Sequence, residues 1–276
     1  MVRLSGFGDE ISADLDEQLD VLRAEGIGYL ELRGAWKKNV TKFTAAEVRL
    51  VSDALARREM RVSCIASPAG KAPIQDDFGP QMDVFKRAIE AALSLRAPYV
   101  RMFSFYMPEK EDPARFRDEV LARMQAMVDE VKDTGLILLS ENEKGLYGEN
   151  AVRCADVLES ISSPRLRALF DPANFVQVGL RPYSDCFELL RQHIEYYHVK
   201  DALFYDGSVV PAGEGDGEFP QIVQAIAASG FSGFLSLEPH LVFAGAASGF
   251  SGSELFSKAV KALRGLLDRA GVHCEG

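Results

Sequence analysis

The 276-residue chain lacks any long apolar run: no stretch reaches the roughly 18 residues that a transmembrane helix needs. Its N-terminal segment reaches the acidic residues Asp9 and Glu10 too soon for the apolar core of a secretory signal. We therefore expect a protein with no membrane partner and a cytoplasmic location.

Cysteine is scarce and scattered. Cys64, Cys154, Cys186 and Cys274 include no pair at CxxC spacing, which excludes a zinc ribbon and a CxxC redox motif. Free thiols are the expected state of such cysteines in a reducing compartment.

Positive charge is also in deficit. The chain has 31 Lys and Arg against 41 Asp and Glu, so its formal net charge is −10. Sequence-independent binding of DNA or RNA depends on Lys and Arg contacts with phosphate, so a nucleic-acid partner is disfavoured. Histidine is rare as well, with only His193, His198, His240 and His273.

Strand-like and helix-like segments alternate from end to end. The expected strands are Val2–Phe7, Tyr29–Arg33, Arg61–Ala66, Tyr99–Phe105, Leu136–Glu141, Leu166–Asp171, Ile194–His198 and Gly233–Glu238. Helices are expected at Asp14–Ala24, from Thr44, and at Pro80–Leu95, Pro113–Thr134, Asn150–Ser160, Tyr183–Gln192, Pro220–Ser229 and Ser253–Ala270. Alternation of this kind is typical of α/β proteins with a parallel sheet.

The length indicates one (β/α)8 barrel, a TIM barrel, over residues 1–276, because that fold needs about 250 residues. An open, doubly wound sheet shares the alternating pattern and is the alternative. The barrel is favoured because the repeating unit occurs eight times. It would also gather into a ring the polar residues that end four successive strands.

Those four residues can each bind a divalent metal. They are Glu141, Asp171, His198 and Glu238, and they recur about every 30 residues or slightly more, which is the length of one βα unit. Strand C-terminal ends converge at one mouth of such a barrel, where active sites are built. A site with three carboxylates and one imidazole suits one divalent ion: Mn²⁺, Mg²⁺, Co²⁺ or Zn²⁺.

The motifs around these residues carry a family resemblance. They are Ser140-Glu141-Asn142, Asp171-Pro172-Ala173-Asn174, His198-Val199-Lys200-Asp201 and Leu237-Glu238-Pro239. With the glycine-rich stretch from Pro211 to Phe219, the chain resembles the xylose-isomerase-like TIM barrels. That superfamily includes sugar and sugar phosphate isomerases and epimerases, keto-inositol isomerases and dehydratases, and endonuclease IV. Four histidines are too few for the endonuclease branch, which uses about three metals.

The resemblance to the tagatose-epimerase-like branch implies specific roles. Glu141, Asp171, His198 and Glu238 are expected to bind one metal, and Glu141 and Glu238 to act as the acid and base. A metal on adjacent oxygens of a hydroxy-ketone would stabilise an enediolate while these carboxylates move the proton. The expected activity is isomerisation or epimerisation of a small sugar, sugar phosphate or polyol ketone. A keto-inositol or sugar-acid dehydratase and a catalytically silent sugar-binding barrel are the alternatives.

The substrate, a small carbohydrate, is expected to contact six further residues. These candidates are Glu31, Arg33, Trp36, Asn174, Lys200 and His240. An Arg fork suits a carboxylate or phosphate, and an aromatic face suits a sugar ring. For Glu31, Arg33 and Trp36 the alternative is an internal ion pair under a packed indole.

Several features stay open at this level. Asn174 stands where many of these epimerases have a second histidine, and Phe204 where they have an arginine. The roles of Asp9, Glu10, Glu143 and the Gly213–Gly217 loop are undecided, the loop being a tight turn or, less readily, a phosphate site. A homo-oligomer is expected only by analogy with related barrels.

Overall fold

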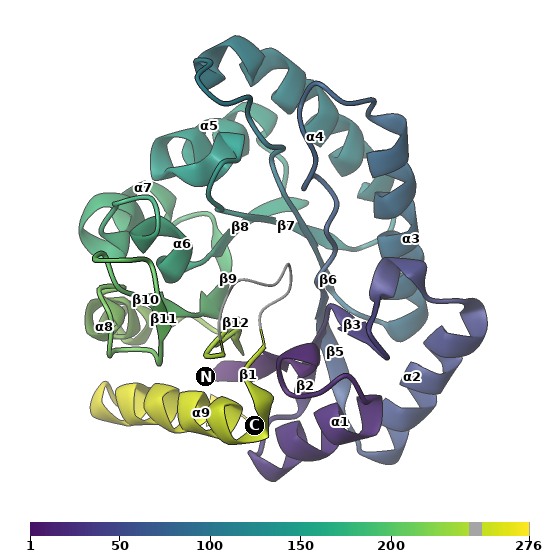
Figure 1. Cartoon of the computed structure of the whole chain (residues 1–276), viewed down its shortest axis with the longest axis vertical. Coiled ribbons are helices and arrows are strands. Elements are labelled where there is room, and N and C mark those ends of the chain that lie inside the picture. The colour runs from purple at the N-terminus through teal and green to yellow at the C-terminus, as the bar shows by residue number, and fades with distance from the viewer. Residues whose placement is uncertain (243–249, 276) are drawn as a thin grey trace.

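Eight parallel strands form a closed barrel at the centre of the computed structural model, which describes residues 1–242 and 250–275 (Figure 1). The strands are β1 (Val2–Phe7), β2 (Tyr29–Leu32), β5 (Arg61–Ile65), β6 (Tyr99–Met102), β7 (Ile137–Glu141), β8 (Leu166–Phe170), β9 (Ile194–Val199) and β12 (Phe234–Leu237). Each pairs with the next along the chain, and β12 pairs with β1 over Arg3–Gly6. That last pairing excludes the open sheet and confirms the predicted (β/α)8 barrel.

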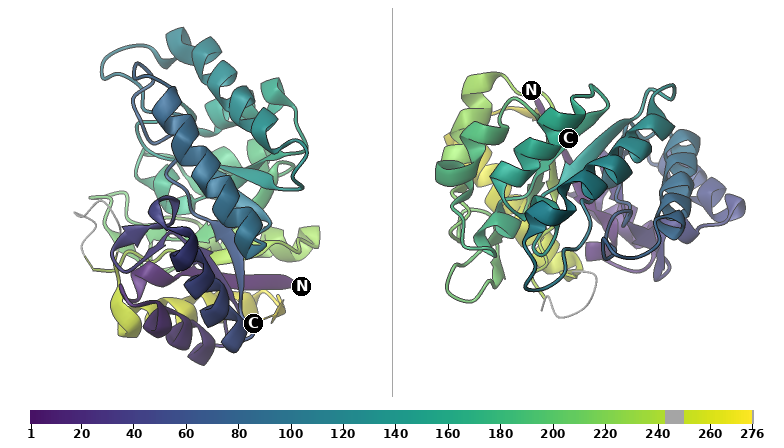
Figure 2. Two further views of the ribbon diagram at one scale, coloured as in Figure 1. Left: turned by 90° about the vertical axis from the view of Figure 1, so that its right-hand side faces the viewer. Right: turned by 90° about the horizontal axis from the view of Figure 1, so that it is seen from above.

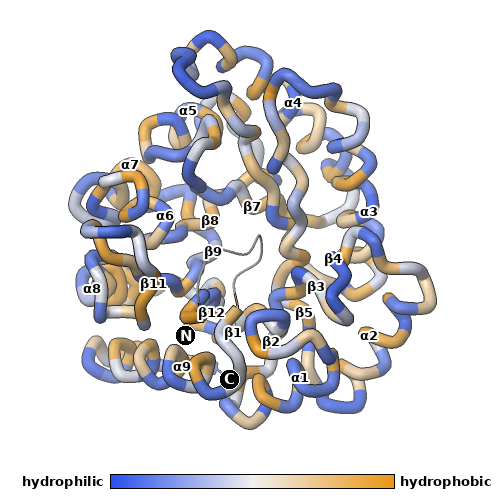
Figure 3. The backbone as a smooth tube through the Cα atoms, viewed as in Figure 1, coloured by the Kyte–Doolittle hydropathy of each residue, from blue (hydrophilic) through white to orange (hydrophobic). Residues whose placement is uncertain are grey.

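Helices surround the barrel on its outside (Figure 1). They are α1 (Leu15–Ala24), α2 (Ala45–Arg57), α3 (Gly79–Leu95), α4 (Arg117–Val131), α5 (Ala151–Ile161), α7 (Glu188–Leu190), α8 (Phe219–Ser229) and α9 (Gly252–Arg269). Hydrophobic and hydrophilic residues alternate along α9 in Figure 3, as expected of a helix with one face on the barrel. None of the described helices is long and apolar enough to cross a membrane.

Some boundaries differ from the sequence prediction. The expected strand to Phe105 ends at Met102, and the helix expected from Pro113 begins as the 3-10 turn η3 (Pro113–Phe116). The helix expected over Tyr183–Gln192 is instead the π-helical η5 (Pro182–Phe187) followed by α7. At Thr44 the predicted capping box is present, because its hydroxyl accepts from the Glu47 amide while the Glu47 carboxylate accepts from the Thr44 amide.

The loops that connect the strands and helices contain short elements that the sequence analysis did not predict. They are the turns η1 (Gly8–Glu10), η2 (Val40–Lys42) and η4 (Tyr147–Glu149), the helix α6 (Pro172–Val176), the hairpins β3 (Gly34–Ala35) with β4 (Lys38–Asn39) and β10 (Asp201–Ala202) with β11 (Val209–Val210), and β13 (Cys274–Glu275). The strand β13 pairs with the start of β1, so the two ends of the described chain lie near each other (Figure 2).

The core has two layers that explain where the site forms. A large cluster fills the space between strands and helices, and a small one contains Cys64, Tyr99, Leu139, Leu169, Tyr196 and Phe234. All six of these belong to barrel strands, and on each of the six strands a residue next to them belongs to the large cluster, so the small cluster lies inside the barrel. Side chains alternate along a strand, so residues two or four positions further on also point inward.

Candidate metal centre and active site

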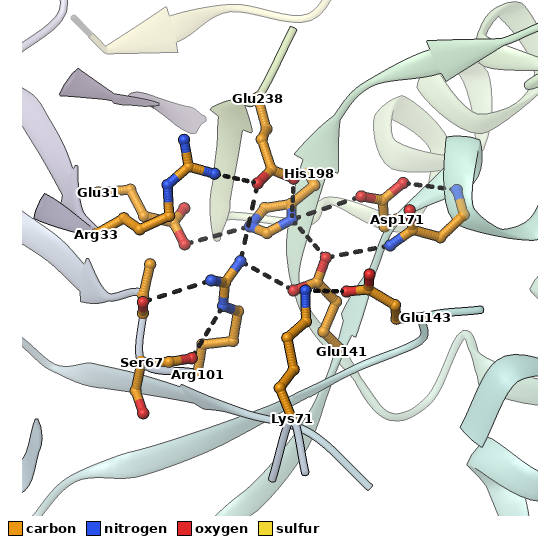
Figure 4. A network of polar contacts seen from close by, with 12 residues as sticks. Glu31, Arg33, Ser67, Lys71, Arg101, Glu141, Glu143, Asp171, His198 and Glu238 are labelled. Carbon is orange, nitrogen blue, oxygen red and sulfur yellow. Dashed lines mark hydrogen bonds and ion pairs between the residues drawn. The ribbon is translucent and has the colours of Figure 1, made fainter. Parts of the chain in front are cut away.

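The four predicted ligands lie together above this inner cluster. One ligand atom from each of Glu141, Asp171, His198 and Glu238 lies within 4.8 Å of the others, and all four residues are buried (Figure 4). The alternation of side chains along each strand explains why these residues meet. Three of them follow Leu139, Leu169 and Tyr196 of the small cluster inside the barrel by two positions, so they point to the same side. Glu238 follows Phe234 of that cluster by four positions, so it points the same way.

The His198 ring has a different environment at each nitrogen. Its Nδ1 lies 3.2 Å from Glu141 Oε1, 3.4 Å from Glu238 Oε2 and 3.7 Å from Asp171 Oδ2. On the other side, Nε2 lies 3.2 Å from Glu31 Oε1. The Nδ1 atom therefore faces the three ligand carboxylates.

Two buried cations, Lys200 and Arg101, lie beside the carboxylates. Lys200 Nζ lies 2.7 Å from Asp171 Oδ2 and 3.1 Å from Glu238 Oε2. Arg101 Nη1 lies 3.0 Å from Glu141 Oε2 and 3.9 Å from Glu238 Oε1. These ion pairs hold the acidic groups in place.

Arg33 joins the cluster from the β2 side (Figure 4). It forms ion pairs with Asp9 at 2.8 Å, Glu10 at 3.1 Å and Glu238 at 3.2 Å. Glu238 is thus bounded by cations on several sides.

These contacts shift the pKa values of the site. Burial alone would raise the pKa of Glu141, but Arg101 and His198 lower it to about 2. Burial would likewise raise the pKa of Glu238, which Lys200 and His240 hold well below its ordinary value. Burial would lower the pKa of His198, whereas the surrounding carboxylates raise it well above its ordinary value. Both glutamates are therefore anions at neutral pH.

The donor set fits a divalent metal ion. Carboxylates and imidazole both serve as ligands of divalent ions such as Mn²⁺, Mg²⁺, Co²⁺ and Zn²⁺, and these ions differ in how strongly they prefer oxygen or nitrogen. Asp171 Oδ2 is a buried atom that accepts no hydrogen bond of good geometry within the described residues, although Lys200 Nζ is near. This carboxylate oxygen lies 2.7 Å from Lys200 Nζ and 3.7 Å from His198 Nδ1, a position that suits it to bind a cation.

A cavity of about 1380 Å³ opens beside the cluster. Glu141 and Glu238 line it, whereas Asp171 and His198 are not among the described residues that line it. Two of the four candidate ligands are therefore placed to touch a small molecule in the cavity, and two lie behind them.

A family model of xylose isomerase-like TIM barrels matches residues 19–264. The chain belongs to the xylose isomerase-like TIM barrel family. No curated protein matches the chain significantly.

Solved structures agree with this barrel. A D-tagatose 3-epimerase-like protein is 16% identical with a TM-score of 0.78, over 98% of each chain. IOLI protein with a zinc atom is 15% identical with a TM-score of 0.78, over 98% of this chain and 99% of that one. The probable 3-DHS dehydratase AsbF from Bacillus anthracis, described as involved in petrobactin synthesis, is 16% identical with a TM-score of 0.73, over 95% and 99%. At such identities the likeness establishes the fold alone.

Of the six residues expected to contact the substrate, four line the cavity and two do not line its described part. Arg33, Asn174, Lys200 and His240 line the cavity. Asn174 also donates to Glu141 Oε1 over 3.3 Å and to the Asn142 carbonyl over 2.9 Å. His240 Nε2 lies 2.9 Å from Glu10 Oε1 and 3.5 Å from Glu238 Oε1, so it connects the η1 turn to the site.

Glu31 and Trp36 are placed elsewhere. Glu31 is fully buried beneath His198 and is absent from the residues that line the described part of the cavity. Trp36, 37% exposed at the turn of the β3–β4 hairpin, packs on Phe43 with ring centroids 5.5 Å apart and does not line that cavity either. Asp9 and Glu143, whose roles the sequence left open, do line it.

The glycine-rich loop is organised by Asp201. Its carboxylate accepts from the amides of Gly213, Gly215 and Gly217 over 2.8 to 3.1 Å, and from the Ala202 amide over 2.8 Å. A Cβ at Gly215 or Gly217 would lie 2.5 Å from Asp201 Oδ1. These amides are already paired within the chain, so the loop is the tight turn rather than a phosphate cradle.

Sequence reasoning missed Arg101. It is buried, lines the cavity and contacts two of the four candidate ligands. The signal was available, because Arg101 follows Tyr99 of the inner cluster by two positions on a strand otherwise made of apolar and aromatic residues.

Proposed function

We propose that this chain is a divalent-metal-dependent isomerase or epimerase of a small sugar, sugar phosphate or polyol ketone. One observation carries the proposal: Glu141 and Glu238 both border the cavity and both lie within 3.4 Å of His198 Nδ1. A substrate in the cavity would meet two ionised carboxylates that also belong to a metal-binding cluster.

Glu141, Asp171, His198 and Glu238 would hold the ion. When bound, a divalent cation supplies Lewis-acid stabilisation of negative charge on the oxygens of a hydroxy-ketone. The remaining chemistry belongs to the chain's own side chains.

The two glutamates would move the proton. One carboxylate removes the hydrogen from the carbon next to the carbonyl, and a carboxylate then returns a proton to the same carbon or its neighbour. Return to the same carbon from the opposite face inverts it, which is epimerisation. Return to the neighbouring carbon exchanges ketose and aldose.

Arg101, Arg33 and Lys200 would position these acids and favour negative charge in the cavity. All three contact Glu238, Arg101 and Lys200 are buried, and Arg101 also contacts Glu141. Fixed cations near a developing oxyanion stabilise the transition state without reorganisation.

A dehydratase is the second candidate. It would begin with the same proton removal but expel a β-hydroxyl group as water, leaving a carbon–carbon double bond. The likeness to the probable dehydratase AsbF favours keeping this reaction in view. A sugar-binding barrel without catalysis is the third, and the presence of both Glu141 and Glu238 at the cavity argues against it.

Incubation with ketoses, aldoses, their phosphates and sugar acids in deuterated water tests the proposal, with added Mn²⁺, Co²⁺, Mg²⁺ or Zn²⁺. We expect deuterium in a C–H position, seen by NMR, together with an epimer or isomer. A conjugated carbonyl product that absorbs in the ultraviolet would instead establish the dehydratase. Binding without exchange or product would establish the silent barrel.

A further inference from the structure

Glu31 occupies a position that neither substrate binding nor the four-ligand site accounts for. It lies on β2 with no exposed surface, and each of its oxygens is engaged. Oε1 lies 3.2 Å from His198 Nε2, while Oε2 accepts from the Tyr196 hydroxyl over 2.8 Å. Figure 4 shows its carboxylate directed at the far side of the His198 ring from Asp171 and Glu141.

A buried chain of hydroxyl groups supports this carboxylate from below. The Tyr196 hydroxyl lies 2.9 Å from Ser63 Oγ, which lies 2.6 Å from Ser5 Oγ. All of these side chains are buried inside the barrel. The second oxygen of Glu31 is therefore fixed, and with it the direction of the first.

The direction of the Glu31 carboxylate bears on which nitrogen of His198 can bind a metal ion. The nitrogen that binds a metal ion must carry no proton, so a neutral ring must keep its proton on the other nitrogen. A carboxylate beside the second nitrogen fixes that tautomer and the orientation of the ring. Here the carboxylate faces Nε2, so that with a metal ion bound the proton would stay on Nε2 and Nδ1, on the side of Glu141, Asp171 and Glu238, would be the ligand.

The ring plane is held as well. Phe7 packs edge-on against His198 with centroids 5.2 Å apart and an interplanar angle of 75°. A 180° flip of the imidazole about its Cβ–Cγ bond would put Cδ2 in the place of Nδ1 and Cε1 in the place of Nε2, so it would break the contacts of both nitrogens.

We propose that Glu31 is a positioning residue that keeps the proton of His198 on Nε2 and so presents Nδ1 to the metal ion. The inference rests on the proposed metal centre. Glu31 acts through His198 and has no direct contact with substrate.

Two conservative variants separate hydrogen bonding from charge. Glu31→Gln keeps the length of the side chain: its oxygen still accepts from Nε2, and its amide donates to Tyr196, which turns its own proton toward Ser63. Glu31→Asp keeps the charge but withdraws the acceptor by one methylene. Positioning predicts that the Gln variant retains more metal affinity than the Asp variant.

Titration calorimetry of the full chain with Zn²⁺ and with Mn²⁺ measures this. Loss of the group that accepts from the far nitrogen of a ligating histidine lowers metal affinity by roughly 10- to 100-fold, and we expect that loss for Glu31→Asp and a smaller one for Glu31→Gln. Ser63→Ala is the matched control for a disturbed buried network. It leaves the Tyr196 hydroxyl donating to Glu31 and Glu31 beside His198, so it is expected to bind metal nearly as the wild type does. Circular dichroism confirms that each variant is folded.

NMR of the zinc-loaded protein with ¹⁵N-labelled histidine gives a readout independent of activity. The wild type and Glu31→Gln are expected to show His198 protonated on Nε2. Affinity ranked Asp above Gln, or wild-type affinity in both variants, would overturn the positioning role while leaving the metal centre intact. Absence of metal binding by the wild type would overturn both proposals.

Discussion

Arg101 donates to Glu141 across the interior of the barrel mouth, with Nη1 3.0 Å from Oε2 and both residues buried. The two strands that carry them, β6 and β7, are neighbours in the sheet. A guanidinium at this distance offsets the burial of the carboxylate, so Glu141 stays ionised where an isolated buried acid would be neutral. The proposed general base is thereby available over a wide pH range.

Arg101→Gln should move the acid limb of the rate profile to higher pH. The pKa of Glu141 is about 2 with Arg101 present, and loss of the guanidinium lets burial raise it. Activity that depends on the carboxylate is present above its pKa and lost below it, so kcat/KM should begin to fall at a higher pH. An unchanged acid limb in kcat/KM would contradict the role of Arg101.

The pH range over which the free energy of unfolding falls in acid should also move to higher pH in Arg101→Gln. Because the folded pKa of Glu141 is depressed from 4.5 to about 2, the group contributes stability above pH 4.5 that is lost as the pH falls toward 2. In Arg101→Gln the pKa of Glu141 in the folded protein rises, so the contribution of Glu141 to stability becomes smaller and is lost at a higher pH. Urea unfolding of the metal-free protein at a series of acidic pH values would detect the shift.

Glu238→Gln is expected to reduce turnover by about 10²- to 10⁴-fold, the usual contribution of a general acid or base. The amide keeps the shape of the side chain, so the fold should persist. Glu195→Gln on β9 is the matched control, since Glu195 accepts from the Tyr99 hydroxyl over 2.8 Å and is not among the described residues lining the cavity. Wild-type rates in Glu238→Gln would remove Glu238 from the acid–base pair.

Asp171→Asn should weaken metal binding without unfolding the chain. Asp171 also caps α6 by accepting from the Asn174 amide over 3.0 Å, and Asn caps helices about as well as Asp. Elemental analysis after dialysis, beside wild type and His198→Ala, is the measurement. About one equivalent of metal retained in all three proteins would exclude the four-ligand centre.

Metal affinity should rise with pH. The pKa of His198 in the metal-free protein lies well above its ordinary value, so Nδ1 carries a proton that a metal ion must displace. Below that pKa, one released proton gives up to about a tenfold gain in affinity per pH unit, and the gain ends above it. Calorimetry in two buffers of different ionisation enthalpy would count the protons released, and a count of zero would be inconsistent with Nδ1 as a ligand.

Asp201→Ala should destabilise the glycine-rich loop. Four backbone amides lose their acceptor, and the unpaired, partly buried donors should together cost at least about 2 kcal/mol. Thermal unfolding would measure the loss, with Asp206→Ala as the control, since that side chain is exposed and caps only Ser208. A melting temperature equal to that of the wild type would mean that the loop does not depend on Asp201.

The sequence by itself determined the barrel and the positions of the four candidate ligands. Eight strand–helix units of similar length suit one parallel barrel, and the C-terminal ends of its strands must meet at one mouth. Because this follows from strand order and from period-two alternation, Glu141, Asp171, His198 and Glu238 could be named from the residues alone. Local signals such as the Thr44 capping box were equally readable.

Only the tertiary structure decided which partner each side chain has. Glu31 and His198 are 167 residues apart in the chain, and Arg33 and Glu238 are 205 apart. No local pattern shows that Glu31 lies beneath an imidazole, that Trp36 packs on Phe43, or that Asp201 takes up the amides of the glycine-rich loop. Such contacts are set by closure of β12 onto β1 and by the register between neighbouring strands, because these place inward-pointing side chains opposite one another.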